Sequence, residues 1–434
     1  MRKDAWLKSA KAKRLYHKYV KDLPIIDFHN HLSPEDLLND RRYENLTQLW
    51  ITPDPYKHRL MRILGVEEEY ITGSASDEEK FLSFARIFPL LAGTPVFHWA
   101  KMELLFLFGK EISLSEKNAK EVYEKGKAIL ARPDFSHNGI LKKFRIDYQS
   151  PVAKLTDDLS LFEKSSEAPS LRGDDLLLPT KDLYKDLSAM TGDAVTDTDS
   201  FLRAVGKRLD LFAEKGCRFA DHALDDGFFD GEEGKKREEM LLLLSKEYAK
   251  RGFTLLLHFG AKRQTSDRLF KLSGPAGGYA AVGTNFPISR LISLLGRMEK
   301  EGALPDVVLF PLNQSDMPAA SAVQGSFSQN KVLSKVQMGP AWWWCDHAFG
   351  ITNALDCISS FGVLSAFIGM TTDSRNVLSF VRHDYFRRIL TNYLVEKSEK
   401  EEWNLSEKEM GVILEKICYF NAKEKINPRK EETK

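Results

Sequence analysis

The sequence has few cysteines, no long apolar run and almost no net charge. Its four cysteines (Cys217, Cys345, Cys357 and Cys418) lack the close spacing of a redox motif or a zinc finger, so we expect reduced thiols and no disulfide scaffold. No run approaches the ~20 apolar residues that a membrane-spanning helix needs. The N-terminal segment lacks the apolar stretch of a signal peptide. These absences predict a cytoplasmic protein without a membrane partner.

The charges balance, with 63 Lys and Arg against 62 Asp and Glu and a formal net charge of +1. Such a chain has no field that would attract a polyanion, which argues against nucleic acid as a partner. With 434 residues, 43% of them hydrophobic and 29% charged, it is long and apolar enough to bury a large core. One large α/β barrel or two to three smaller domains would fit this length.

Short apolar runs alternate with segments of helical periodicity along most of the chain. The expected strands cover residues 24–31, 253–258, 306–313 and 365–373, with weaker ones at 216–222 and 335–340 and poor ones near 146–150 and 168–172. Helical patterns separate them, for example at 201–212 and 380–394, which indicates a parallel sheet of βα units covered on both faces.

The number and order of these runs predict the fold class. Eight strands favour a distorted (β/α)8 barrel of the TIM type, with a doubly wound sheet as the alternative. Residues 35–145 contain no convincing strand, while 77–91 and 115–130 have helical patterns. We therefore expect one barrel domain over 1–434, with a helical insertion at 35–145 after the first strand.

Two histidines separated by one residue, His29 and His31, end the first predicted strand. Side chains at positions i and i+2 of a strand share a face, so both imidazoles would point into the mouth of the barrel. Two neutral imidazoles on one face suit a divalent transition metal, although two polar residues at an exposed strand end would also explain the pair. Asp373 ends another apolar run and could supply a carboxylate ligand or a base.

Three further features could join this cluster. His258 follows three leucines, which fits either a buried core histidine or a side chain beside the metal. Arg375, two residues after Asp373, could clamp a substrate carboxylate with its planar guanidinium or form an ordinary ion pair. Trp342, Trp343 and Trp344 could form an aromatic wall for the apolar face of a sugar, or pack in the core.

At these residues the chain resembles the uronate isomerase (glucuronate isomerase) family of the amidohydrolase superfamily. The resemblance extends from Leu15 to Asn421. It is most specific in six segments: Asp27-Phe28-His29-Asn30-His31-Leu32, Tyr70-Ile71-Thr72-Gly73, Gly216-Cys217 with Asp221-His222-Ala223-Leu224, His258-Phe259-Gly260-Ala261, Trp342-Trp343, and Thr372-Asp373-Ser374-Arg375.

The resemblance implies an aldose–ketose isomerase that interconverts D-glucuronate with D-fructuronate and D-galacturonate with D-tagaturonate. It implies that His29, His31 and Asp373 bind a divalent metal. Zinc is the expected metal, with manganese, iron, cobalt and nickel as alternatives. Its remaining assignments are substrate contacts from Arg375, Arg172, Trp342, Trp343 and His258, and a catalytic role for Tyr56 beside Asp373. We also expect a small-molecule hexuronate as substrate and a homo-oligomer.

The chain departs from the family pattern in the substrate-binding region. The family histidine before the tyrosine is Pro55 here, and the tryptophan before the family arginine is Leu171. Two other functions use the same residues. A metal-dependent hydrolase would activate water against a lactone, ester or amide, and a divergent binder would keep the sugar-acid pocket without turnover.

Overall fold

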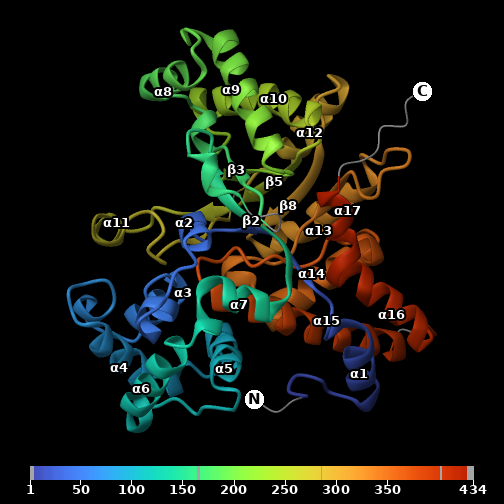
Figure 1. The fold of residues 1–434 in the computed structure, drawn as a ribbon. Coiled ribbons are helices and arrows are strands. Elements are labelled where there is room, and N and C mark those ends of the chain that lie inside the picture. The colour runs from blue at the N-terminus through green and yellow to red at the C-terminus, as the bar shows by residue number, and fades with distance from the viewer. Residues whose placement is uncertain (1–3, 164–166, 285, 401–402, 428–434) are drawn as a thin grey trace.

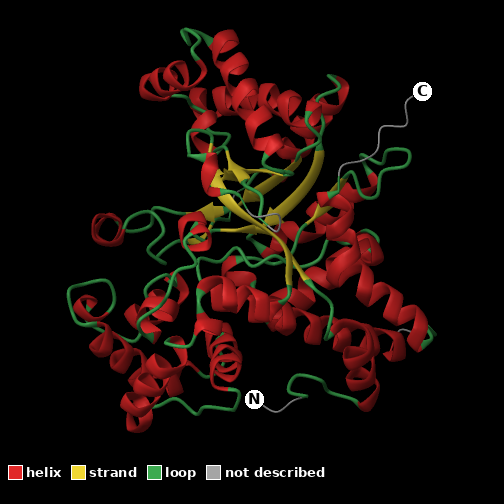
Figure 2. Ribbon diagram, in the orientation of Figure 1, coloured by secondary structure: helices red, strands yellow, loops and turns green. Residues whose placement is uncertain are grey.

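The structure, a computed structural model, describes residues 4–163, 167–284, 286–400 and 403–427. A curled sheet lies at its centre and helices surround it (Figures 1 and 2). All neighbouring strands of this seven-stranded sheet are parallel. In spatial order they are β1 (Ile25–Asn30), β2 (Ile146–Lys154), β3 (Ser170–Arg172), β4 (Phe219–Leu224), β5 (Thr254–Phe259), β8 (Asp306–Pro311) and β9 (Val336–Met338). The fold is thus mixed α/β with a curled half-barrel.

The central strands β5 and β8 are almost continuously apolar, and polar residues of β1 are buried beside them. Every residue of β1 and of β5 is buried, as expected for strands covered on both faces. Because neighbouring strands are parallel, their carboxyl ends meet at one edge of the sheet. Seven of the eight predicted strands are confirmed, including the two poor ones near 146–150 and 168–172.

The prediction of an eighth strand over 365–373 is wrong. A short 3-10 helix covers Leu364–Ala366, and the following residues form no ladder. The segment still lies against β1, since the Asp373 amide donates to the His29 carbonyl at 3.1 Å and the His31 amide to the Ser374 carbonyl at 2.8 Å. The ladder fails because the Asp27 carboxylate accepts the Thr372 amide hydrogen at 2.6 Å, and because Asp373 adopts a left-handed conformation with φ +48°.

Helices and turns fill residues 31–145, all of which the structure describes and none of which forms a strand. The α-helices here are α2 (Pro34–Leu38), α3 (Pro55–Ile63), α4 (Asp77–Ile87), α5 (Pro95–Phe108), α6 (Ala119–Leu130) and α7 (His137–Phe144). They form a block on one side of the sheet (Figure 1). The helix predicted at 77–91 is confirmed as α4 followed by a 3-10 turn at Phe88–Leu91, because Pro89 cannot continue an α-helix.

Helices also follow the later strands, as the alternating pattern predicts. They are α8 (Lys181–Thr191), α9 (Thr198–Glu214), α10 (Gly231–Lys250), α12 (Ile288–Lys300), α13 (Met317–Ala322), α14 (Ala348–Phe361), α15 (Val381–Lys400), α16 (Glu407–Glu415) and α17 (Asn421–Ile426), with α1 (Ala10–Leu15) near the N-terminus. A separate arm leaves β5 through β6 (Ala261–Lys262), α11 (Asp267–Ser273) and β7 (Ala281–Val282), of which β6 and β7 pair with each other. None of the described helices is both long and apolar enough to cross a membrane.

Candidate active site

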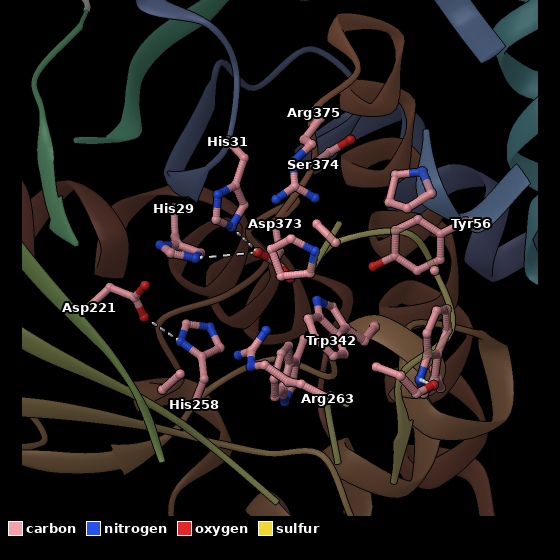
Figure 3. Close-up of a pocket in the computed structure, with 18 of the residues that line it drawn as sticks. His29, His31, Tyr56, Asp221, His258, Arg263, Trp342, Asp373, Ser374 and Arg375 are labelled. Atoms are coloured by element: carbon pink, nitrogen blue, oxygen red, sulfur yellow. Dashed lines mark hydrogen bonds and ion pairs between the residues drawn. The ribbon is translucent and has the colours of Figure 1, made fainter. Parts of the chain in front are cut away.

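A pocket lies where the carboxyl ends of β1, β3, β4 and β5 meet the segments around Trp342 and Asp373 (Figure 3). Barrel enzymes place their chemistry at this edge of the sheet. The structure brings all nine predicted site residues into its lining: His29, His31, Tyr56, Arg172, His258, Trp342, Trp343, Asp373 and Arg375. Residues that are up to 346 positions apart in the chain therefore share one cavity.

His29, His31 and Asp373 form a compact cluster at the pocket floor. The Nε2 atoms of His29 and His31 lie 3.3 and 3.0 Å from the same Asp373 oxygen, Oδ1. Their candidate ligand atoms all lie within 4.8 Å of one another. Ligands that share an ion at ~2.1 Å are themselves separated by ~3.0–3.4 Å, so the spacing of the three side chains fits one divalent cation.

The polar chemistry of this cluster also fits a cation. Asp373 Oδ2 and His29 Nδ1 are buried and have no hydrogen-bond partner among the described residues. Burial lowers the pKa of His31 to about 3, which keeps its imidazole neutral, as a metal ligand must be. Burial alone would raise the pKa of Asp373, but its hydrogen bonds with His29 and His31 hold the pKa well below its usual range.

A second group of acid and histidine side chains overlaps the first. His29, Asp221 and His258 also lie within 4.8 Å of one another through their possible ligand atoms. Asp221, however, already has two partners, since His258 Nδ1 lies 2.7 Å from Oδ1 and Arg172 Nη1 lies 3.3 Å from Oδ2. A cation there would compete with a guanidinium, which favours the group of His29, His31 and Asp373 as the metal site.

Tyr56 reaches the pocket from the first turn of α3. Asp54 caps this helix, accepting from the Tyr56 amide at 3.0 Å, and Pro55 takes the first helical position, which suits proline. The Tyr56 ring packs edge-on against Trp99 and Trp344. Burial raises the pKa of its hydroxyl well above the ordinary value, and this hydroxyl has no hydrogen-bond partner within the described part of the chain.

Three arginines line the pocket, and they differ in how their donors are used. Arg172 pairs with Asp174 at 2.8 Å as well as with Asp221. Arg263 pairs with Asp225 at 2.7 Å and stacks over Trp343. The structure records no hydrogen bond or ion pair between Arg375 and any other described residue.

The three tryptophans combine the two roles that the sequence leaves open. Trp342 is buried, donates from Nε1 to the Phe310 carbonyl at 3.0 Å and packs edge-on against His258. Trp344 donates to the Ala280 carbonyl at 3.0 Å. Because all three also line the pocket, they pack against the protein and bound the cavity at once.

Sequence reasoning assigned no role to Asp221, Arg263 or the stretch 275–280, all of which contribute to the pocket lining. Asp221 is the acidic residue of the predicted strand at 216–222, but its partners follow only from the order of the strands. Arg263 lies in an irregular arm, where no periodicity signals a site. The stretch 275–280 has the glycines of a loop, and its position over α3 depends on hydrogen bonds from Arg59 to the Gly278 and Ala280 carbonyls.

Fold and site together define a class: an enzyme with a half-barrel of parallel strands and a histidine–carboxylate cluster at their carboxyl edge. Comparison with known proteins gives the particular group. The sequence pattern of the family described as glucuronate isomerase matches residues 1–241 and 228–425. The chain belongs to this family.

Curated relatives and solved structures agree with this assignment. The chain is 37% identical to a uronate isomerase of Caldanaerobacter subterraneus subsp. tengcongensis, with 98% of each chain covered, and 36% identical to one of Geobacillus thermodenitrificans, with 96% and 97% covered. The structure of uronate isomerase from Thermotoga maritima aligns with a TM-score of 0.88 at 28% identity, covering 98% of this chain and 99% of that one. That of glucuronate isomerase from Caulobacter crescentus, at 21% identity with 99% and 98% covered, shares the fold with a TM-score of 0.89.

Proposed function

We propose that this protein is a uronate isomerase that interconverts D-glucuronate with D-fructuronate and D-galacturonate with D-tagaturonate. The observation that carries the proposal is the coincidence of two findings. The chain matches uronate isomerases over nearly its full length, and the histidine–aspartate cluster lies in the same pocket as Tyr56 and Arg375, whose polar groups have no partner among the described residues.

His29, His31 and Asp373 would bind the divalent cation, for which zinc is our first choice and manganese, iron, cobalt and nickel are alternatives. When bound, such an ion would polarise the carbonyl and the adjacent hydroxyl oxygen of the sugar, which stabilises the charge that develops as the C2 proton leaves. The buried surroundings of the cluster would strengthen this effect, because charges interact more strongly where the effective dielectric constant is low.

Asp373 is our candidate for the base. Its Oδ1 faces the two histidines, while its buried Oδ2 has no partner among the described residues. Oδ2 can take the proton from C2 of the aldose and return it to C1. Tyr56, whose hydroxyl stays protonated, can donate to the sugar oxygens or pass a proton between them. The sequence leaves an exchange of these two roles open, but a hydroxyl that stays protonated suits a donor and an ionised carboxylate suits a base.

Arg375 is the better candidate for the substrate carboxylate. Its guanidinium has no ion pair with the rest of the described chain, so it can clamp the C6 carboxylate with two hydrogen bonds. Arg172 already donates to Asp174 and Asp221, which leaves fewer of its five N–H groups for the substrate. His258, Trp342 and Trp343 would bound the sugar ring, and the fixed carboxylate would set which carbon meets Asp373.

The finer parts of the fold and assembly also belong to this proposal. The hydrogen bonds between β1 and the segment near Asp373 support a (β/α)8 barrel of one domain over 1–434, with residues 35–145 as a helical insertion in it. A homo-oligomer is supported by exposed apolar side chains at α14, Phe349 and Phe361, and a cytoplasmic setting by four free cysteines.

The function is tested by incubating the purified protein with each uronate in water enriched in oxygen-18. We expect ketose to form from D-glucuronate and D-galacturonate without uptake of the label at the carboxyl group. Hydrolysis of a panel of lactones, esters or amides with label uptake and no ketose would instead identify a hydrolase. Binding of a uronate without any turnover would identify the non-catalytic binder.

A further inference from the structure

Asp221 is a buried carboxylate at the centre of the pocket wall, between two side chains expected to touch the sugar. Its exposed fraction is 2%. It lies on β4, between Arg172 on β3 and His258 on β5. Arg172 and Asp221 are register partners, while His258 pairs with Ala223, two residues further along the same face of β4. Three adjacent strands therefore bring these side chains into one row.

The two oxygens of Asp221 are divided between its neighbours. Oδ1 lies 2.7 Å from His258 Nδ1, and Oδ2 lies 3.3 Å from Arg172 Nη1 (Figure 3 shows the His258 contact). An ionised carboxylate can only accept, so the proton on the imidazole must be on Nδ1. His258 Nε2 then carries a lone pair, and this atom is buried and has no partner in the described part of the chain.

We propose that Asp221 is a positioning residue that fixes two pocket side chains at once: the Nδ1–H form of His258, whose Nε2 accepts a hydroxyl hydrogen of the sugar, and the direction of the Arg172 guanidinium. This proposal rests on the proposed function and adds a residue to it. Asp174 takes part from the other side, because it pairs with Arg172 at 2.8 Å and accepts the Ala223 amide hydrogen at 2.7 Å. The wall is thus cross-linked from β3 to β5.

Asparagine at this position distinguishes the roles of the two oxygens. Its amide has one acceptor and one donor, whereas His258 Nδ1–H and Arg172 both need an acceptor. Since the guanidinium is charged, we expect the asparagine oxygen to face Arg172 and the asparagine NH2 group to face His258. The histidine would then carry its proton on Nε2 and present a donor to the pocket instead of an acceptor.

The experiment compares the wild-type protein with Asp221→Asn, His258→Gln and the double variant. Nitrogen-15 NMR of histidine-labelled protein gives the protonated nitrogen of His258, with His258→Gln identifying its signals. Steady-state kinetics with both uronates gives KM and kcat, and elemental analysis gives the bound metal. We use Asp147→Asn as a matched control, because Asp147 also accepts from two side chains, Tyr419 and Lys423, but lies at the amino end of β2.

We expect Nδ1–H in the wild type, Nε2–H in Asp221→Asn, and a loss in kcat/KM of about 10- to 100-fold carried mainly by KM. Metal content should not change, and the double variant should lose less than the product of the two single losses. Asp147→Asn should retain wild-type kinetics.

Several results would overturn the assignment: Nε2–H in the wild type, kinetics of Asp221→Asn within threefold of wild type, multiplicative losses in the double variant, or loss of metal in Asp221→Asn. The wild-type NMR result tests the Nδ1–H form of His258 even where Asp221→Asn does not fold. A wild-type protein without uronate turnover would refute the proposed function, while the NMR result would still test the position of His258.

Discussion

At the scale of single residues, Asp373 is central to the account because its two oxygens have different surroundings. Oδ1 faces His29 and His31, and Oδ2 has no partner within the described residues. We predict that Asp373→Asn lowers kcat by about 1,000-fold, because it removes the base and weakens a proposed metal ligand. The fold should persist, since asparagine tolerates the left-handed conformation at this position. Turnover and circular dichroism test this, and near-normal activity would refute the role.

Arg375 gives a second prediction at this scale. If its unpaired guanidinium binds the C6 carboxylate, Arg375→Gln should raise KM for both uronates by about 10- to 100-fold. A neutral aldose that lacks the carboxylate provides the comparison, and its weak turnover should change little. An equal effect on the acidic and the neutral sugar would contradict the contact.

Residue spacing made part of the site predictable. His29 and His31 follow from the two-residue period of a strand, and Asp373 from its place at the end of an apolar run. The role of Asp221 was not predicted, because it depends on the order of the strands. Only the adjacency of β3, β4 and β5 brings Arg172 and His258 to its two oxygens. No local pattern in a sequence encodes such a contact.

At the scale of elements, α3 makes the folding stability depend on pH through His58. This histidine is buried two residues after Tyr56, and burial lowers its pKa to about 4. The unfolded chain, with an imidazole pKa near ~6.5, therefore binds more protons than the folded chain between these values. Folding stability from this group is complete above pH ~6.5 and falls as the pH drops towards about 4.

The expected size of this effect is about 2 kcal/mol of unfolding free energy between pH 7.5 and pH 5. Denaturant unfolding at the two pH values measures it, and His58→Gln is the control that should remove this part of the pH dependence. An identical dependence in both proteins would show that His58 does not carry it.

The seam between β1 and the segment before Asp373 depends on another buried acid, Asp27. Its carboxylate accepts from the Thr372 amide, from the hydroxyls of Thr371 and Thr372, from Asn30 and from His383. We predict that Asp27→Asn destabilises the fold by about 3 kcal/mol. The NH2 group of asparagine would replace one acceptor oxygen and would then face hydrogen-bond donors.

The metal ligands should loosen together with this seam. Thr371 Oγ1 accepts the His29 amide hydrogen at 2.9 Å, so a displaced segment moves a ligand of the proposed site. We therefore expect weaker metal retention in Asp27→Asn under chelator titration, alongside its lower unfolding midpoint. Unchanged stability and metal retention would contradict the role of the seam.

The same seam explains which elements the sequence could predict. β5 and β8 are nearly continuous apolar runs whose burial on both faces leaves few alternatives. The run at 365–373 has the same composition, but side-chain acceptors replace the ladder, and Asp373 turns into the left-handed region. Apolar pattern predicts that a segment is buried and extended, not which atoms accept its amide hydrogens.

At the scale of the whole molecule, the parallel sheet collects the carboxyl ends of strands that are distant in sequence into one edge (Figure 2). The alternation of runs and helical patterns was enough to predict this mixed α/β architecture. The arm from β6 to β7 was not predictable, because its position depends on the arginines of α3, Arg59 and Arg62, which bind its carbonyl oxygens.

The most direct test of the account is the metal content of the purified protein, measured together with that of His31→Gln. We predict about one divalent ion per chain in the wild type and almost none in the variant after identical dialysis, since three ligand side chains with an open coordination position form the proposed site. A wild-type protein that isomerises uronates at full rate without any divalent ion, or a variant that retains the ion fully, would contradict the central claim.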